Sequence, residues 1–215
     1  YPGFEDGIDG FSLGEKMLRG AERFGAQTKM AEVRAVRLNG AVKEIETAGG
    51  TLYGRTVILA TGATPRALGV AGEQELIGRG VSYCASCDGM FYRGKTVVIV
   101  GGGNTAAADA ILLSRICEKV FVVHRRDTLR ATKIYHEPLM KAENSTVSEL
   151  LHGDKLTGVK VRNIQTGEET EISCDGLFVC IGREPASELV KGQLELDGAG
   201  YIVADESTRT SLPGV

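Results

Sequence analysis

The sequence predicts an α/β protein built around a parallel β-sheet, and three neighbouring features carry that prediction. Residues Thr96-Val97-Val98-Ile99-Val100 form an unbroken apolar, β-branched run, which is typical of a strand buried on both faces of a parallel sheet. A glycine-rich turn follows, and residues 104–114 then combine small and apolar side chains as in a helix packed closely on a sheet. A second apolar run covers residues 120–123, and its short spacing from the first suits a right-handed crossover.

Length and composition bound the classes of protein to consider. At 215 residues the chain can form one large domain or two small ones. Its 42% hydrophobic and 25% charged residues are ordinary for a globular fold in water. The net charge of −3 gives no reason to expect nucleic acid or a membrane surface as partner, and no apolar run approaches the ~18 residues of a membrane span. Five cysteines do not make a disulfide scaffold, which predicts a reducing, cytoplasmic compartment.

The N-terminal third predicts a helix and a small antiparallel meander. Residues 12–24 suit an amphipathic helix with Ser12 as its N-cap. Strand-like runs follow at residues 27–36, 41–46 and 51–59, with a turn at Ala48-Gly49-Gly50. The third run leads into Ala60-Thr61-Gly62-Ala63, where small side chains permit a close backbone approach. Residues 64–80 are predicted to be a linker or surface loop.

The C-terminal part predicts one more helix, a hairpin and another buried strand. Residues 135–143 suit an amphipathic helix. Residues 157–163 and 168–173 flank Gln165-Thr166-Gly167 and predict a hairpin. Residues 176–181 form an apolar run that ends at Gly182-Arg183-Glu184-Pro185.

The glycine turn after the first strand matches the dinucleotide-binding fingerprint. Gly101-x-Gly103-x-x-Ala106 follows a predicted strand and opens a predicted helix, which is the context the fingerprint requires. The first glycine allows the tight turn, the second lets a pyrophosphate approach, and the small third residue packs helix on strand. Asn104 and Thr105 fall at the helix N-terminus, where free N–H groups and the helix dipole favour phosphate. A plain glycine turn is the alternative.

The end of the second strand indicates which nucleotide would bind. An acid at this point selects the ribose 2′-hydroxyl of NAD, whereas arginine accommodates the 2′-phosphate of NADP. Here the strand ends in His124-Arg125-Arg126, with Arg130 four residues further on, and guanidinium groups bind a dianion through charge-assisted hydrogen bonds. Asp127 is an acid that would favour NAD, but it follows two arginines. The pattern predicts NADPH; a solvated basic loop is the alternative.

Cys84 and Cys87 form a C-x-x-C pair that fits a redox dithiol, a zinc half-site or chance. Structural zinc requires four ligands, usually from two such pairs, and the other cysteines and the three histidines are not spaced to complete the set. A short C-x-x-C loop instead favours a redox pair, because it can lower the pKa of one thiol. Asp88 beside the pair is a candidate proton donor or acceptor, or a simple turn carboxylate. The cysteines elsewhere in the chain are predicted to be buried structural thiols, namely Cys117, Cys174 and Cys180.

Taken together, these motifs resemble those of bacterial-type, low-molecular-weight thioredoxin reductase. The matching pieces follow one another in the family's order: Ala60-Thr61-Gly62-Ala63, Cys84-Ala85-Ser86-Cys87-Asp88-Gly89, Gly101-Gly102-Gly103-Asn104-Thr105-Ala106, His124-Arg125-Arg126-x-x-x-Arg130-Ala131 and Ile181-Gly182-x-x-Pro185. The resemblance implies a two-domain class II pyridine nucleotide-disulfide oxidoreductase with a Rossmann-like NADPH domain inserted into an FAD domain. It implies a homodimer that passes electrons from NADPH to FAD, to the cysteine pair and then to thioredoxin.

The resemblance also implies a role for each matching residue. Cys87 would face the flavin, Cys84 would attack thioredoxin and Asp88 would protonate during that exchange. The 2′-phosphate would be held by Arg125, Arg126 and Arg130, next to His124 and the glycine turn. The remaining cofactor contacts would come from Ile181, Gly182, Thr61, Gly62 and the backbone of Val33.

The domain boundaries expected from the resemblance divide the chain into three parts. Residues 1–67 would be the middle of the FAD domain, residues 68–187 the NADPH domain with the cysteine pair, and residues 188–215 a return to the FAD domain. The chain begins at Tyr1 and is expected to be a piece of something longer, without the family's two outer FAD-binding segments. Residues are also expected to be missing between Asn144 and Ser145, and Met90 stands where the family often has phenylalanine in a region thought to touch thioredoxin.

Three other functions fit parts of the pattern. The first is the flavoprotein reductase of a peroxiredoxin (alkyl hydroperoxide) system, against which the arginines argue because that relative uses NADH. The second is a dithiol oxidase, which would lack the nicotinamide clamp. The third is a non-catalytic NADP-binding module.

Overall fold

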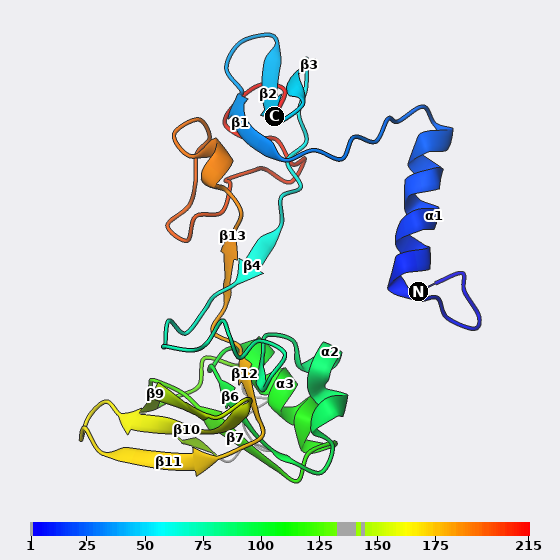
Figure 1. Ribbon diagram of the computed structural model, residues 1–215. Helices are drawn as coiled ribbons and strands as arrows, with labels where there is room; N and C mark the ends of the chain where they lie inside the picture. Colours follow the sequence, from blue (N-terminus) through cyan, green and yellow to red (C-terminus); the bar gives the residue numbers. More distant parts are fainter. Residues whose placement is uncertain (1, 133–140, 143–144) are drawn as a thin grey trace. The chain divides into compact units, whose positions relative to one another are not determined.

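The computed structural model describes residues 2–132, 141–142 and 145–215, and these residues form two compact units (Figure 1). The first unit comprises Tyr1–Leu59, Glu188–Leu196 and Ile202–Val215, and the second comprises Ala60–Ser187 and Asp197–Tyr201. Over the described residues, no helix is both long and apolar enough to cross a bilayer.

The second unit contains the parallel sheet that the sequence predicts. In its described part five strands run in the order β5-β12-β6-β7-β8, and every neighbouring pair is parallel. Their bounds are β5 Val81–Ser82, β12 Gly176–Val179, β6 Thr96–Val100, β7 Lys119–Val123 and β8 Lys141–Ala142. The predicted strand–turn–helix–strand unit is confirmed, with α3 spanning Asn104–Ser114.

The central sheet is covered on both faces, which explains its continuous apolar sequence. Alternate side chains of β6 point to opposite faces. Val97 and Ile99 pack with Ala110 and Leu113 of α3. Val98 and Val100 instead belong to a core shared with a second, antiparallel sheet. The resulting helix–sheet–sheet arrangement confirms the α/β fold class (Figure 1).

The antiparallel sheet has the order β11-β10-β9 and includes the predicted hairpin. β10 (Leu156–Asn163) pairs with β11 (Glu169–Ser173) around the predicted turn, and β9 (Ser145–His152) pairs with β10 on its other side. The predicted helix at 135–143 is wrong at Lys141–Ala142, which form strand β8 beside β7. The rest of that prediction lies outside the described residues, as does Asn144 and therefore the expected gap before Ser145.

A two-stranded ribbon corrects the prediction that residues 64–80 are loop, at residues 64 and 65. β4 (Ala63–Pro65) pairs antiparallel with β13 (Arg183–Pro185), and the Arg66 backbone N–H adds a hydrogen bond of 3.0 Å to the Gly182 carbonyl. Proline is tolerated at this position because a strand at a sheet edge need not donate on both sides. Composition alone did not indicate this pairing, since its partner lies more than a hundred residues away in the sequence.

The first unit contains the predicted meander, with strands β1 (Val33–Arg37), β2 (Lys43–Thr47) and β3 (Gly50–Gly54) in sequential order. The third strand ends earlier than predicted, and residues 55–59 are not strand. Val36 and Leu38 pack with Val190 and Leu194, close to the 3-10 turn η3 (Glu188–Val190).

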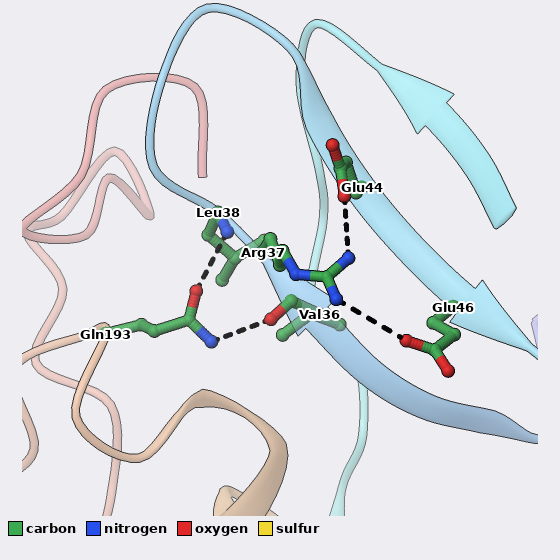
Figure 2. A network of polar contacts seen from close by, with 6 residues as sticks. All are labelled: Val36, Arg37, Leu38, Glu44, Glu46 and Gln193. Atoms are coloured by element: carbon green, nitrogen blue, oxygen red, sulfur yellow. Dashed lines mark hydrogen bonds and ion pairs between the residues drawn. The ribbon is translucent and has the colours of Figure 1, made fainter.

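The Gln193 side chain fastens this C-terminal segment to β1 (Figure 2). Its Oε1 accepts from the Leu38 backbone N–H at 2.8 Å, and its Nε2 donates to the Val36 carbonyl at 2.8 Å. Arg37 lies on the same strand and forms exposed ion pairs with Glu44 and Glu46 of β2. The Gln193 side-chain amide thus makes the two hydrogen bonds that a neighbouring strand would otherwise make with the Leu38 N–H and the Val36 carbonyl.

Helix α1 spans Gly10–Arg23, and its N-cap corrects the sequence prediction. Asp9, not Ser12, is the cap, because the Asp9 carboxylate accepts from the Ser12 backbone N–H at 3.0 Å. Ser12 therefore lies in the first turn of the helix. None of the residues of α1 is buried.

Candidate active site

The glycine turn joins β6 to α3 in a conformation that only small residues allow. Gly101 has a φ of +147°, and a Cβ there would collide with the Cys180 carbonyl and lie 2.9 Å from the Ala106 Cβ. A Cβ on Gly103 would meet nothing within 4 Å, so the turn is open on that side. In the fingerprint, Gly101 and Ala106 thus allow close packing of the chain, and Gly103 leaves the helix N-terminus accessible.

A cavity of about 250 Å³ opens beside this turn, at the carboxyl ends of β6 and β7. Five of the predicted site residues line it: Gly101, His124, Arg125, Arg130 and Ile181. The other lining residues are Arg66, Leu68, Val100, Val123, Ser145, Thr146 and Val147. Three guanidinium groups around one small cavity create a site for an anion with an apolar side, which suits a phosphorylated nucleoside.

His124 is buried and lines the cavity as a neutral ring. Its Nε2 lies 3.0 Å from the Thr128 carbonyl, and its ring fills the space that a Cβ on Gly102 would need. Burial lowers the pKa of His124, and the neighbouring Arg130, Arg126 and Arg125 lower it further, while the Thr128 bond opposes them. The ring therefore adds no positive charge to the arginines at neutral pH.

The remaining residues predicted at this end of the sheet lie outside the cavity lining. Arg126 and Thr105 are exposed. Asn104 begins α3, and its Oδ1 accepts from the Thr132 backbone N–H at 2.9 Å. Arg66 in contrast was not predicted; its Nε lies 3.1 Å from Glu184 Oε1 across the β4–β13 ribbon.

Cys84 and Cys87 form a disulfide within the second unit, with their Cα atoms 5.3 Å apart. Cys84 caps the short helix α2 (Ala85–Asp88), which continues into the 3-10 turn η1 (Gly89–Tyr92). This pairing is the state expected of an oxidised redox pair. No cluster of three or more potential metal ligands occurs in the described part of the chain.

The disulfide segment is held against the core by its small and aromatic residues. Tyr92 packs edge-on against Phe178 of the central sheet, with ring centroids 5.3 Å apart. A Cβ on Gly89 would approach Leu113 Cδ2 of α3 to 2.8 Å, so a larger residue there would require the Leu113 side chain to shift. Ala85 is buried in the same core. Cys84 is half-buried, whereas Cys87 is exposed.

Polar groups contact the Cys84 sulfur and the backbone beside it. Its sulfur accepts from the Cys87 backbone N–H at 3.2 Å and lies 3.4 Å from Ser86 Oγ. Asp88 accepts from Ser82 Oγ at 2.7 Å, and the same Ser82 oxygen accepts from the Cys84 backbone N–H. Hydrogen bonds to a sulfur favour its charged form once the disulfide is reduced.

The other cysteines differ from one another in burial. Cys174 is buried, and burial raises the pKa of its thiol to about 12. Cys117 and Cys180 are only partly buried, which corrects the prediction for these two thiols. Burial raises the pKa of Cys180 as well, and its Sγ donates to Asp109 Oδ2 at 3.3 Å. Such neutral thiols are poor nucleophiles.

The residues predicted to contact a flavin are divided between the two units. Val33 lies on β1 of the first unit and is exposed. Thr61 and Gly62 are exposed residues of the second unit, just before β4. Gly182 follows β12, where its carbonyl accepts from the Arg66 backbone N–H.

Comparison with known proteins decides the family. The pyridine nucleotide-disulphide oxidoreductase family matches residues 12–215. Thioredoxin reductase of Streptomyces coelicolor is 45% identical over 223 residues, which cover 100% of this chain and 69% of that protein. The chain belongs to the bacterial low-molecular-weight thioredoxin reductases. The thioredoxin reductase of Mycolicibacterium smegmatis is likewise 45% identical, with 100% of this chain and 71% of that protein covered.

Solved thioredoxin reductases share the fold. The crystal structure of the Lactococcus lactis enzyme matches with a TM-score of 0.80 and 37% identity over 100% of this chain and 73% of that chain. The T. acidophilum enzyme matches with a TM-score of 0.79 and 35% identity over 100% of this chain and 72% of that chain.

This thioredoxin reductase chain has a buried carboxylate that its local sequence does not indicate. Glu73 is only 3% exposed and accepts three hydrogen bonds, from the Leu68 and Gly69 backbone N–H groups and from Tyr83 Oη. It thereby ties the chain leaving β4 to the residue before Cys84. Its position in a segment rich in glycine and charge predicts a loop, and only its burial marks it as structural.

Proposed function

We propose that this chain is the nucleotide- and disulfide-bearing part of an NADPH-dependent thioredoxin-disulfide reductase, cytoplasmic and homodimeric as the resemblance implies. One observation carries the proposal: a C-x-x-C disulfide and an arginine-lined cavity at a dinucleotide turn occur in the same compact unit. A site for an electron donor and a site for an electron acceptor in one unit favour electron transfer over nucleotide binding alone.

The residues at the cavity fit NADPH. Gly103 leaves the N-terminus of α3 open to a pyrophosphate, and Arg125 and Arg130 line the cavity where a 2′-phosphate would bind. No carboxylate among the described residues pairs with Arg125, Arg126 or Arg130, so these guanidinium groups are available to a dianion. Residues 68–187 would thus be the NADPH domain.

FAD belongs to the proposal through the family alone. Val33 falls in one unit and Thr61 and Gly62 in the other. Residues 1–67 and 188–215 would contribute to the FAD domain. When bound, NADPH and FAD supply the two electrons that reduce the Cys84–Cys87 disulfide.

The dithiol would then reduce thioredoxin by two exchanges. The Cys84 thiolate attacks the thioredoxin disulfide, forms a mixed disulfide and releases one thioredoxin thiolate, which Asp88 protonates. The Cys87 thiolate next attacks Cys84, restores the Cys84–Cys87 disulfide and releases the second thioredoxin thiol. The hydrogen bonds on the Cys84 sulfur support it as the attacking thiolate. Exposed Met90 and Phe91 on η1 offer thioredoxin an apolar contact.

The alternatives predict different cofactors or no chemistry. A peroxiredoxin reductase that uses NADH has no need of arginines at the cavity, and a dithiol oxidase needs no nicotinamide site. A non-catalytic NADP-binding module would not need the disulfide.

The test is oxidation of NADPH by the purified protein with thioredoxin, with NADH as the control and the flavin absorbance followed in the same sample. Turnover with NADPH alone, together with a bleachable flavin band, would support the proposal. A Cys87→Ser variant should trap thioredoxin as a mixed disulfide on Cys84. NADH-driven turnover, or trapping only in a Cys84→Ser variant through Cys87, would contradict the cofactor or the cysteine roles, respectively.

A further inference from the structure

The loop that carries the arginines, residues 125–132, is fastened to the glycine turn by its backbone; we call it the arginine loop. The Gly102 carbonyl accepts from the Arg130 N–H at 2.7 Å and from the Ala131 N–H at 3.0 Å. The Asn104 side chain accepts from the Thr132 N–H at 2.9 Å. The turn expected to bind a pyrophosphate and the loop expected to bind a 2′-phosphate therefore share three hydrogen bonds.

Apolar side chains of the arginine loop add a second attachment. Leu129 is 8% exposed and packs with Ala131 of the loop and Ala107 of α3. The three arginines of the loop are exposed, whereas Leu129 and Ala131 are buried. Leu129 does not line the cavity, and any effect it has on a nucleotide must pass through the position of the loop.

Attachment of this kind matters because arginine side chains are long and flexible. A dianion bound by guanidinium groups on a loosely held loop would have to order the loop as well as the side chains, and that ordering weakens binding. A loop already docked on the turn leaves only the side chains to be ordered. The same docking contributes nothing to a nucleotide that lacks the 2′-phosphate.

We propose that Leu129 and Asn104 are positioning residues that set the preference for a 2′-phosphorylated nucleotide by holding the arginine loop on the glycine turn. The inference rests on the proposed function and deepens it. Leu129 holds the loop by packing against α3, and Asn104 holds it by accepting from the Thr132 backbone.

The experiment is titration of the purified wild-type, Leu129→Ala and Asn104→Ala proteins with NADPH and with NADH, followed by calorimetry. If Leu129→Ala leaves the loop in its binding position for about a tenth of the time, the Kd for NADPH rises about tenfold. The Kd for NADH stays within about twofold, so the ratio of the two constants falls about tenfold. Asn104 is exposed, so Asn104→Ala is expected to fold and to lower the ratio in the same direction.

Leu156→Ala is the matched control, because Leu156 is a fully buried leucine of β10 that does not line the cavity. It should lower the melting temperature and leave the ratio unchanged. Equal losses for NADPH and NADH in Leu129→Ala and Asn104→Ala, or an unchanged ratio in both, would overturn the positioning role alone. Wild-type protein without a preference for NADPH would overturn the proposed function and this inference together.

Discussion

Glu73→Gln is the substitution whose effect the structure defines most sharply. Glu73 Oε1 accepts from the Leu68 N–H at 2.9 Å and from Tyr83 Oη at 2.7 Å, and Oε2 accepts from the Gly69 N–H at 2.8 Å. Glutamine keeps the shape of the side chain but replaces one acceptor oxygen with an NH₂ group. That group cannot accept a hydrogen bond, so the Leu68 or the Gly69 backbone N–H loses its partner.

The magnitude follows from the loss of one acceptor in a buried site. An unsatisfied buried donor costs about 1–3 kcal/mol, so we expect the free energy of unfolding of the second unit to fall by about 2 kcal/mol. For a unit of this size that is a fall in melting temperature of roughly 4–8 °C. Tyr83→Phe removes a single hydroxyl and leaves two backbone donors satisfied, and its cost should be smaller, about 1 kcal/mol.

Thermal and urea unfolding of the purified variants, followed by circular dichroism, measures both effects. Glu75→Gln is the control because Glu75 is exposed two residues away, and such surface changes stay within about 0.5 kcal/mol. A Glu73→Gln protein that unfolds with the wild type would refute the argument that this carboxylate is a buried acceptor of three bonds. If Glu73→Gln lowered the stability less than Tyr83→Phe, that result would refute the assignment of the Leu68 and Gly69 backbone N–H groups as donors to Glu73.

Two further predictions concern the first unit and the thiols. Gln193→Ala should lower the free energy of unfolding by about 1–3 kcal/mol because it leaves the Leu38 N–H without its acceptor. Arg37→Ala should lower it by less than about 1 kcal/mol because the Arg37 ion pairs are exposed. Urea unfolding of both variants tests this order, and equal losses of stability would contradict it. In the reduced native protein, iodoacetamide should modify Cys84 and Cys87 first. Burial raises the pKa of Cys174 to about 12, so at pH 8 only about one Cys174 thiol in ten thousand is ionised. Mass spectrometry after timed labelling measures the rates, and Cys174 reacting as fast as Cys84 would contradict the burial argument.

Local patterns predicted the elements in which neighbouring side chains are all suited to the same environment. β6 and α3 have the bounds that the sequence indicated, because a β-branched run and a row of small residues are recognisable without knowledge of their neighbours. The hairpin of β10 and β11 was predicted for the same reason, since its turn residues lie beside its strands. The N-cap of α1 was misassigned because Asp9 and Ser12 are both good caps, and only backbone geometry distinguishes them.

Pairings across long sequence separations were not predictable in this way. Arg66 meets Glu184 across 118 residues, and Gln193 meets the Leu38 backbone across 155 residues. Neither contact leaves a periodic pattern, because each depends on one polar side chain at one position. The three arginines of the cavity illustrate the difference: Arg125 and Arg130 follow a recognisable strand, whereas Arg66 enters the cavity lining only through the β4–β13 ribbon.

By itself, the sequence determined the family, the parallel sheet, the glycine turn with its arginines, and the cysteine pair, because these are encoded in contiguous residues with fixed spacing. Only the tertiary structure decided which of those residues share a cavity, that His124 is buried and neutral, that Glu73 is a buried acceptor and that Leu129 fastens the arginine loop. The physical reason is that burial belongs to the packed chain: the same side chain is a solvated charge or a structural acceptor according to neighbours that the local sequence does not name.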